Sequence, residues 1–352
     1  MKKVIIFLMI LIINSSILYS KEVHVYLCFK DLQETLLKEF EKETGIEVIL
    51  GWDKIMGTNE VIEQLEKSAG NPKASIWISG VGLGHIEGKN KNLTIPYRSP
   101  FSKNTSKEFK DKDYYWTGLY IGSLSIGVNT KLAKEQNLKI PNGWDDLIKS
   151  EYRNKIRMAN PNSSGTAYNV ITTILDINNG NEKKTFKYLK KLDKNINFYT
   201  KSGSQPGREC AKGEIPIAIG YSHDFLMRIS EGAPIKIISP KEGTGFEISA
   251  ISLIKNGPDI ENAKIFYNWI LSKKGQDILA KHFVIPVSKI ADKRKIGVVN
   301  GKRYLDIGNL ISVKQDMEWD AENKKRLIEK WNNEIGRKNK NKIENFDKYE
   351  LK

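Results

Sequence analysis

The side chains best suited to bind a ligand or to react are an adjacent histidine and aspartate, His223 and Asp224, together with a later glutamate, Glu247. A neutral imidazole donates one hydrogen bond and accepts another, and a carboxylate accepts several. Together they suit neighbouring hydroxyls, as on a sugar ring. Two alternatives stay open. The pair could cap a helix that begins near Phe225, and the three side chains could supply enough ligands for a metal ion.

Hydroxyl side chains also gather in three short turns, which follow predicted strands and precede or border predicted helices. The N-terminus of a helix exposes unpaired N–H groups at the positive end of its dipole, so it favours an anion. Serine and threonine are also ordinary N-caps, which is the alternative. Ligands of α/β sheets bind beyond the carboxyl ends of the strands, so three such turns favour a site for an anion. The candidate residues are Thr58, Ser163, Ser164, Gly165, Thr166, Ser202 and Ser204.

Catalysis has little support in the sequence. There is no Gly-x-Ser-x-Gly elbow, Walker loop or His-Glu-x-x-His pair. His223 beside a serine is conceivable, but nothing in the spacing selects such a pair. Cys28 and Cys210 could form a disulfide or be two buried thiols, and they do not make a zinc site by themselves. We expect no enzymatic activity, no cofactor and no resident metal.

The elements that must position these residues alternate between strand and helix. This alternation predicts an α/β fold with mostly parallel sheets flanked by helices. Two longer apolar runs, at 120–128 and 246–253, are expected to cross between two lobes. Shorter strands are predicted at 23–28, 46–51, 75–79, 155–159, 196–199, 215–220 and 235–238, and helices at 32–44, from 58, at 144–148, from 163, at 183–192, 261–271, 274–280 and 322–335.

Composition and charge narrow the class of protein. Of 352 residues, 39% are hydrophobic and 28% charged, which argues against a membrane-embedded or disordered body. The formal net charge of +15 is spread along the chain and suits an anionic small ligand. A nucleic-acid binder is a rival that would bind DNA with a steep salt dependence. Residues 1–20 have a basic start, an apolar run and a plausible cut after Ser20, so they predict a signal peptide and a periplasmic location.

Several stretches resemble the extracytoplasmic solute-binding proteins of ATP-driven importers, in the group that covers ferric iron, thiamine, phosphonates and hexose phosphates. The resemblance implies a two-lobed periplasmic binding protein of type 2, with the ligand in the cleft and a permease partner in the inner membrane. We expect lobe 1 at 21–122 with 247–300, lobe 2 at 123–246 with 301–336, and a charged, disordered tail at 337–352. The matching stretches are 36–48 (LLKEFEKETGIEV), 116–129 (WTGLYIGSLSIGVN), 160–169 (NPNSSGTAYN), 202–220, 232–245 (GAPIKIISPKEGTG) and 316–331.

The resemblance also bears on the ligand. Ferric-binding members have adjacent tyrosines after the strand equivalent to 215–220, whereas this chain has a single one, Tyr221. The His-Asp pair with a later glutamate is similar to hexose-phosphate-binding members, which implies that His223, Asp224 and Glu247 hold sugar hydroxyls. The hydroxyl-rich turns would then hold the phosphate. We expect a monomeric receptor for a hexose 6-phosphate, with no nucleic-acid partner. Ferric iron held by Tyr221 and the same three residues, a thiamine or phosphonate ligand, and a phosphate-ester hydrolase remain alternatives.

Overall fold

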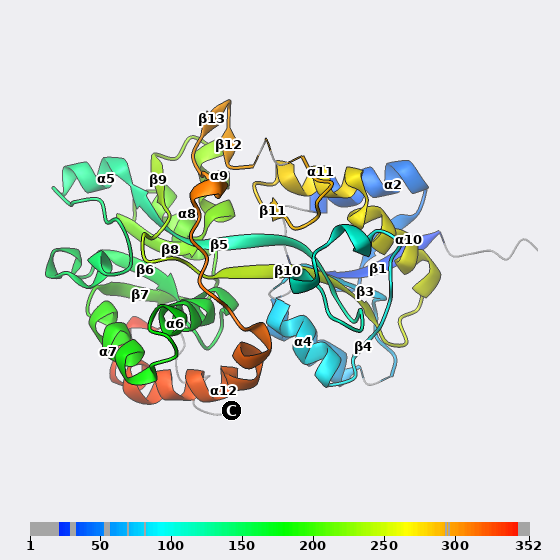
Figure 1. Cartoon of the computed structure of the whole chain (residues 1–352), viewed down its shortest axis with the longest axis horizontal. Helices are drawn as coiled ribbons and strands as arrows, with labels where there is room; N and C mark the ends of the chain where they lie inside the picture. The colour runs from blue at the N-terminus through cyan, green and yellow to red at the C-terminus, as the bar shows by residue number, and fades with distance from the viewer. Residues whose placement is uncertain are drawn as a thin grey trace, which may run out of the picture.

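The computed structural model describes residues 21–28, 33–52, 57–68, 70–80, 82–292, 294 and 296–343. Figure 1 shows two lobes joined by two long strands, β5 (Thr117–Asn129) and β10 (Phe246–Ile254). These strands pair antiparallel along most of their length. The predicted α/β fold with two lobes and two crossing strands is therefore confirmed. The predicted signal peptide at 1–20 lies outside the described residues.

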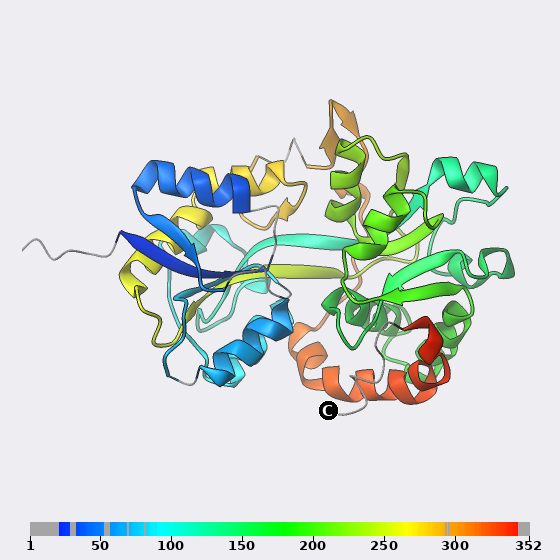
Figure 2. The ribbon, with the colours of Figure 1, turned by 180° about the vertical axis from the view of Figure 1, so that it is seen from behind.

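The sheet of the first lobe begins with parallel strands and ends on the crossing strands. β1 pairs in parallel with β2 and β3, and β3 pairs antiparallel with β10. Val25 packs with the core under α2 and α10, whereas Tyr26, the next residue, packs with the core under α3. This alternation puts helices on both faces of the sheet, as Figure 2 shows from behind. The elements are β1 (Glu22–Leu27), η1 (Gln33–Leu37), α2 (Lys38–Thr44), β2 (Glu47–Leu50), α3 (Thr58–Lys67), β3 (Ile76–Ile78), α4 (Gly82–Asn90), β4 (Thr94–Ile95), α10 (Ile260–Leu271), α11 (Lys273–Lys281) and β11 (Ile285–Pro286).

The second lobe repeats the arrangement around the other end of β5. β8 and β9 pair antiparallel with β5, and β6 joins β8 and β7 in parallel. One face of this sheet packs against α6, α7 and α12, and the other against α8 and α9. The elements are α5 (Thr130–Glu135), β6 (Ile156–Ala159), α6 (Gly165–Ile177), α7 (Glu182–Asp193), β7 (Ile196–Thr200), α8 (Gln205–Ala211), β8 (Ile217–Tyr221), α9 (Ser222–Ser230), β9 (Ile235–Ile238), β12 (Val298–Val299), β13 (Lys302–Arg303) and α12 (Met317–Glu334).

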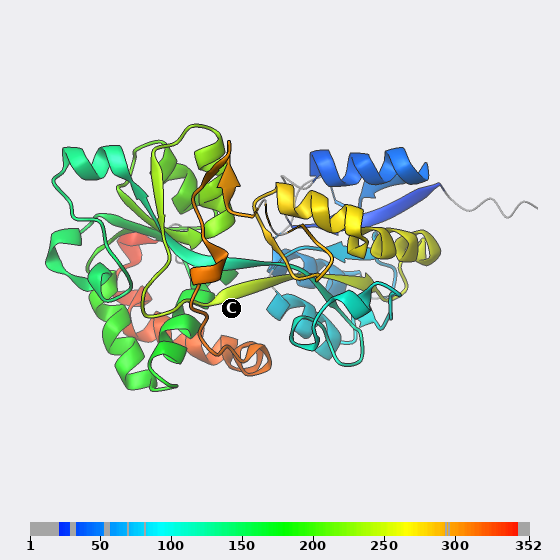
Figure 3. The same ribbon diagram turned by 45° about the horizontal axis from the view of Figure 1, so that its top comes forward.

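The hairpin of β12 and β13 belongs to the core of the second lobe. Ile296, Val299 and Leu305 pack with Phe225 and Leu226 of α9. Figure 3 shows the hairpin beside this lobe, away from the sheet of the first. The predicted lobe boundaries, which assign residues up to 300 to lobe 1, stay a prediction.

The end of the chain differs from the expectation. α12 begins at Met317 rather than at residue 322, because the Asp316 side chain accepts a hydrogen bond from the Trp319 N–H (3.0 Å) and caps the helix. The tail expected to be disordered from residue 337 carries two 3-10 turns in its first part, at Gly336–Lys338 and Lys340–Lys342, and its disorder stays a prediction. Ile343 is 5% exposed and forms a parallel bridge with Tyr199, so a single apolar residue docks an otherwise charged segment. Residues 344–352 lie outside the described part. Of the described helices, none is both long and apolar enough to cross a membrane.

Candidate functional site

His223 and Asp224 lie in the first turn of α9, which follows β8 directly. Because β8 pairs with β5, the start of α9 lies against the middle of that crossing strand. The Ser123 hydroxyl of β5 donates a hydrogen bond to the Ser222 hydroxyl of α9 (3.0 Å), and both side chains are buried. The His223 Nε2 atom stands 4.0 Å from Oδ1 of Asp224. α9 begins at Ser222 and its N-cap is Tyr221, so the alternative in which the pair caps a helix that begins near Phe225 is wrong: both residues lie inside the first turn.

Glu247 reaches the same point from the other crossing strand. It is the second residue of β10 and pairs with Gly122 of β5. A methyl group on Gly122 would stand 2.7 Å from Cε1 of His223 and 3.4 Å from Oε1 of Glu247. A side chain at this position would displace the imidazole, so glycine leaves the space in which the two residues meet. Backbone pairing thus brings together residues that lie far apart in the sequence.

The carboxyl group of Glu247 is held toward its neutral form. Burial raises the pKa of Glu247 well above its usual value, and the charge of Asp224 raises it further, against a smaller opposing effect of Tyr221. A protonated carboxyl donates one hydrogen bond and still accepts others. The site can therefore present both a donor and acceptors to a polar ligand.

Aromatic rings fix the imidazole of His223. Its ring stacks on Tyr221 with the centroids 5.6 Å apart and 19° between the planes, and Tyr120 approaches it edge-on at 6.2 Å. His223 is 5% exposed. The Tyr120 hydroxyl lies 2.9 Å from the Ser79 hydroxyl at the end of β3, so the contact continues into the first lobe.

Two predicted phosphate residues converge in the second lobe. Ser164 is the N-cap of α6, and its hydroxyl accepts a hydrogen bond from the Ala167 N–H (3.5 Å). A methyl group on Gly203 would collide with Oγ1 of Thr166 and stand 2.9 Å from Oγ of Ser164. The backbone of the 202–204 turn thus lies against both hydroxyls, and Gly165 is the first residue of α6 between them. The capping alternative holds for Ser164.

The remaining hydroxyls of these turns have different roles. The Ser163 hydroxyl donates to the Lys201 carbonyl (2.8 Å), so it ties one turn to the next. The Ser202 and Ser204 hydroxyls lie 3.2 Å apart. A cation that the sequence analysis missed is next to them, because Nη1 of Arg208 donates to Oγ of Ser204 (2.6 Å). Arg208 lies four residues after Ser204, the N-cap of α8, so a helix there would place the two side chains on the same side. The spacing could not be used from the sequence because no helix was predicted at this position.

Tyr221 links the two groups of residues. Burial raises the pKa of its hydroxyl well above the usual value, the charge of Glu247 adds to this, and the Thr166 side chain opposes it. Both Glu247 and Thr166 are therefore neighbours of this phenol. Thr166 and the group of His223, Asp224 and Glu247 therefore lie on either side of the buried phenol of Tyr221.

Thr58 lies in the first lobe, apart from the other candidates. It is the first residue of α3, and a methyl group on Gly80 would stand 2.7 Å from its Oγ1 and 3.2 Å from the Cys28 Sγ. Cys28 and Cys210 are both free thiols. Burial raises the pKa of Cys28 to about 12, and the charge of Glu247 contributes to the rise. Thr58 thus borders the junction of the lobes. Residues 53–56, which include Met56 of the predicted turn, lie outside the described part of the chain.

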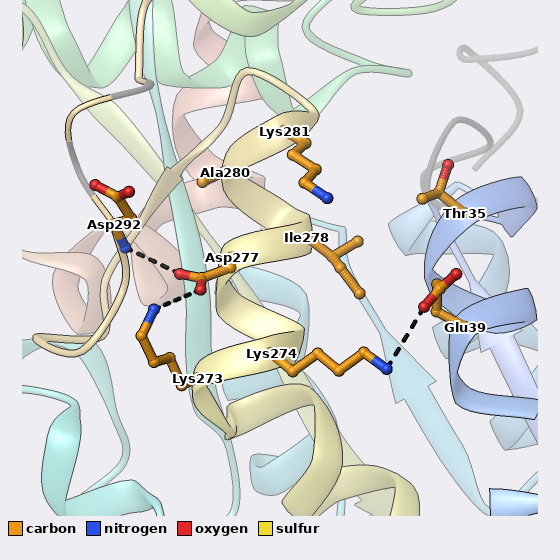
Figure 4. Close-up of a pocket in the computed structure, with 9 residues that line it drawn as sticks. All are labelled: Thr35, Glu39, Lys273, Lys274, Asp277, Ile278, Ala280, Lys281 and Asp292. Carbon is orange, nitrogen blue, oxygen red and sulfur yellow. Dashed lines mark hydrogen bonds and ion pairs between the residues drawn. The ribbon is translucent and has the colours of Figure 1, made fainter. Parts of the chain in front are cut away.

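Two cavities of the described residues lie elsewhere. One of about 640 Å³ lies between α11 and the start of α2 (Figure 4), where Lys273 pairs with Asp277 at 2.5 Å. The other, of about 270 Å³, lies beside Arg98 and Tyr114. Neither is lined by a predicted site residue. Within the described residues, no group of three or more His, Cys, Asp or Glu side chains is arranged to hold a metal ion.

Comparison with known proteins gives the family. The model of the bacterial extracellular solute-binding proteins matches residues 85–308. An uncharacterized Haemophilus influenzae protein is 32% identical over 79% of this chain and 81% of its own length. A putative 2-aminoethylphosphonate-binding periplasmic protein of Salmonella typhimurium is 28% identical over 67% of this chain and 68% of its own.

A solved structure agrees with these relatives. It is the periplasmic binding protein AfuA from Actinobacillus pleuropneumoniae with exogenous fructose-6-phosphate bound. It superposes with a TM-score of 0.81 at 31% identity and covers 89% of this chain and 98% of its own. The chain therefore belongs to the bacterial extracellular solute-binding proteins.

Proposed function

We propose that this solute-binding protein is the receptor of an ATP-driven importer and that it binds a hexose phosphate between its lobes. The observation that carries the proposal is the meeting of His223 and Glu247 at Gly122, with Asp224 beside His223. The Tyr221 phenol lies between this group and the Thr166 hydroxyl. A ligand with hydroxyls at one end and an anion at the other matches this arrangement.

The sugar would lie against the group of His223, Asp224 and Glu247. Asp224 accepts hydrogen bonds from hydroxyls, and Glu247 in its neutral form donates one and accepts others. A ligand without hydroxyls leaves these groups desolvated and unpaired, which costs binding free energy. The proposed contacts therefore select sugars over inorganic phosphate.

The phosphate would lie over the hydroxyl-rich turns. The Ser164 and Thr166 hydroxyls and the N-terminus of α6 at Gly165 offer donors, and Arg208 adds a positive charge beside Ser204. Ser163 would hold the turn, and Ser202 would join the anion contacts. We propose that Thr58 approaches the same ligand from the first lobe when the lobes close.

The fructose-6-phosphate in the AfuA structure supports this class of ligand, because that protein is similar over nearly the whole described chain. The name of the Salmonella relative makes 2-aminoethylphosphonate the second candidate. A phosphonate would use the same anion contacts but would offer no ring hydroxyls to Asp224. Ferric iron is less favoured, because Tyr221 is a single tyrosine and no metal-binding group is found among the described side chains.

Location and partners follow from the same family. Several relatives are named periplasmic proteins, which supports export directed by residues 1–20. We propose that the mature protein acts as a monomer, delivers its ligand to a permease in the inner membrane and performs no catalysis.

A thermal-shift panel on the mature, metal-stripped protein tests the proposal. It includes glucose and fructose 6-phosphates, the free sugars, inorganic phosphate, thiamine, 2-aminoethylphosphonate and ferric citrate. A ligand at about 100 times its Kd stabilises the fold by about 2.7 kcal/mol. We expect a shift with a hexose phosphate and no release of phosphate over hours. A shift with ferric citrate or the phosphonate alone would overturn the proposed ligand, and steady phosphate release would indicate a hydrolase.

A further inference from the structure

A chain of hydrogen bonds joins α12 to the start of the crossing strand β10, one residue before Glu247. The Phe246 N–H donates to Oε1 of Gln315 (3.2 Å), and Nε2 of Gln315 donates to Oδ2 of Asp320 (3.2 Å). On the other side, Nδ2 of Asn169 donates to the Phe246 carbonyl (2.8 Å). The peptide groups on both sides of Phe246 are therefore held by side chains from α6 and from the segment that precedes α12.

The segment that precedes α12 is built into the same place. The Thr244 N–H donates to the Ile311 carbonyl (2.8 Å), and the Val313 N–H donates to the Thr244 carbonyl (3.0 Å). Figure 1 shows this segment passing across the crossing strands before it enters α12. Gln315 is thus delivered to β10 by backbone pairing, so its contact with Phe246 is a fixed part of the fold.

The far end of the chain of hydrogen bonds is a pair of carboxyls, those of the buried Asp320 and of the half-buried Asp176. Asp320 is 2% exposed, and the Tyr168 hydroxyl donates to its backbone carbonyl (2.6 Å). Oδ2 of Asp176, on α6, is buried without a hydrogen-bond partner among the described residues. Burial removes hydration from a carboxylate, so it disfavours the ionised form of each of these two groups.

The neighbouring charges agree with this geometry. Burial, together with the charges of Asp176 and Asp316, raises the pKa of Asp320 to about 7, against a smaller opposing effect of the hydrogen bond from Gln315. Burial also raises the pKa of Asp176 to about 6, with the charge of Asp316 as a second cause. The other titratable groups that face the pair are Tyr168 on α6, whose phenol stays neutral, and Arg326 on α12, which acts on that phenol.

We propose that Gln315 and Asp320 are positioning residues for Glu247, and that ionisation of the Asp176–Asp320 pair loosens them and weakens ligand binding. This rests on the proposed function only in naming the ligand. When both carboxyls are charged, their repulsion separates the first turn of α12 from α6. Gln315 moves with α12 and withdraws its acceptor from the Phe246 N–H, so the first residues of β10 and the Glu247 side chain lose their fixed position.

Calorimetric titration of fructose 6-phosphate tests the proposal across the range from about pH 5.5 to about pH 8.5. We expect the Kd of the unmodified protein to rise about tenfold over that range beyond the change of a variant with Asp320→Asn, which keeps the shape but removes the charge. Gln315→Ala raises the Kd about tenfold at every pH. Glu318→Gln, on the exposed side of the same helix, is the matched control and follows the unmodified protein.

Hydrogen exchange of the ligand-free protein makes the test independent of the ligand. The protection of the Phe246 amide should fall with rising pH in the unmodified protein and in Glu318→Gln, and stay level in Asp320→Asn. If no hexose phosphate binds, the proposed function is wrong. The pH dependence of the exchange rate of the Phe246 amide still tests whether Gln315 and Asp320 position β10. If all three variants match the unmodified protein in both Kd and amide protection, the inference is wrong.

Discussion

The two lobes bring different chemistry to the candidate site. The second lobe supplies Asp224, Thr166 and the Arg208 guanidinium, which can recognise a charged and hydroxylated ligand. The first lobe supplies neutral groups, Thr58 and the hydroxyl pair of Tyr120 and Ser79 on the crossing strand and β3. Under the proposed function, the second lobe would recognise the ligand and the first lobe would cover it when the lobes close, so recognition and closure would be separate tasks.

The two buried histidines show the same contrast. His85 of the first lobe stacks on Trp77 at 4.0 Å, donates from Nε2 to the Ser79 carbonyl (3.0 Å) and accepts from the Ser252 hydroxyl at Nδ1 (2.8 Å). It is completely buried among neutral partners. His223 is almost as buried but lies between aromatic rings and two carboxyl groups. Burial alone therefore does not mark a functional histidine, and the neighbouring groups do.

The largest expected effect concerns His85 and the stability of the first lobe. Burial lowers the pKa of His85 to about 4, below the value of about 6.5 for an unfolded chain. The unfolded state then binds more protons below pH 6.5, so stability is lost as the pH falls from about 6.5 to about 4, by about 3 kcal/mol in total. Calorimetric unfolding of the ligand-free protein measures this loss. His85→Gln should reduce the slope of stability against pH, and an unchanged slope would remove the contrast between the histidines.

Asp224→Ala should weaken hexose phosphate binding by about 10- to 100-fold, because charge-assisted hydrogen bonds to the sugar are lost. Inorganic phosphate should lose less than about threefold, since it does not reach these contacts. Glu231→Ala, at the exposed end of the same helix, is the control. Isothermal titration calorimetry with both ligands measures the two changes in Kd. Equal losses of affinity for the two ligands would contradict the recognition of sugar hydroxyls by the second lobe.

Arg208→Gln should weaken phosphorylated ligands about tenfold and leave free sugars unchanged, because a charged donor beside Ser204 is replaced by a neutral one. The salt dependence of binding should also become flatter. Lys212→Gln removes a positive charge just after the same helix and serves as the control. A similar loss of affinity in both variants would mean that the overall positive charge of the protein attracts the phosphate, and that a local contact with Arg208 does not.

Thr58→Val should have the smallest effect, a loss of about threefold, since one neutral hydrogen bond from the covering lobe is removed. Thr58→Ser keeps the hydroxyl and should bind as the unmodified protein does. Titration together with the dissociation rate tests this, because a covering contact acts on release. A loss of affinity as large as that of Asp224→Ala would show that both lobes contribute to recognition of the ligand.

Most of the fold could be predicted because its signals are local. The apolar runs at 120–128 and 246–253 lie within β5 and β10, and the His-Asp pair follows a predicted strand. α4 was missed because Gly82, Gly84 and Gly88 interrupt any apolar periodicity, although their small size lets the helix pack closely on Trp77 and Ile248. The helix expected at 144–148 is reduced to a single 3-10 turn at Asp146–Ile148.

The site could be predicted only in outline. Neighbouring serines differ in role according to which one caps the helix, so Ser164 lies against Gly203 while Ser163 bonds to a carbonyl. A shift of one residue in a helix start decides this, and sequence patterns do not resolve it. The positions of Glu247 and Gln315 depend on long-range pairing with β5 and β10, which no local pattern contains.

The strand β5 has a consequence for how the molecule unfolds. Its first half contributes Leu119 and Tyr120 to the core of the first lobe, and its second half contributes Ile126 and Val128 to the core of the second. One continuous backbone of 13 residues is thus a structural member of both cores. Neither lobe can unfold without removing part of a strand from the core of the other. We therefore expect the two lobes to unfold as one cooperative unit, with a single peak in differential scanning calorimetry.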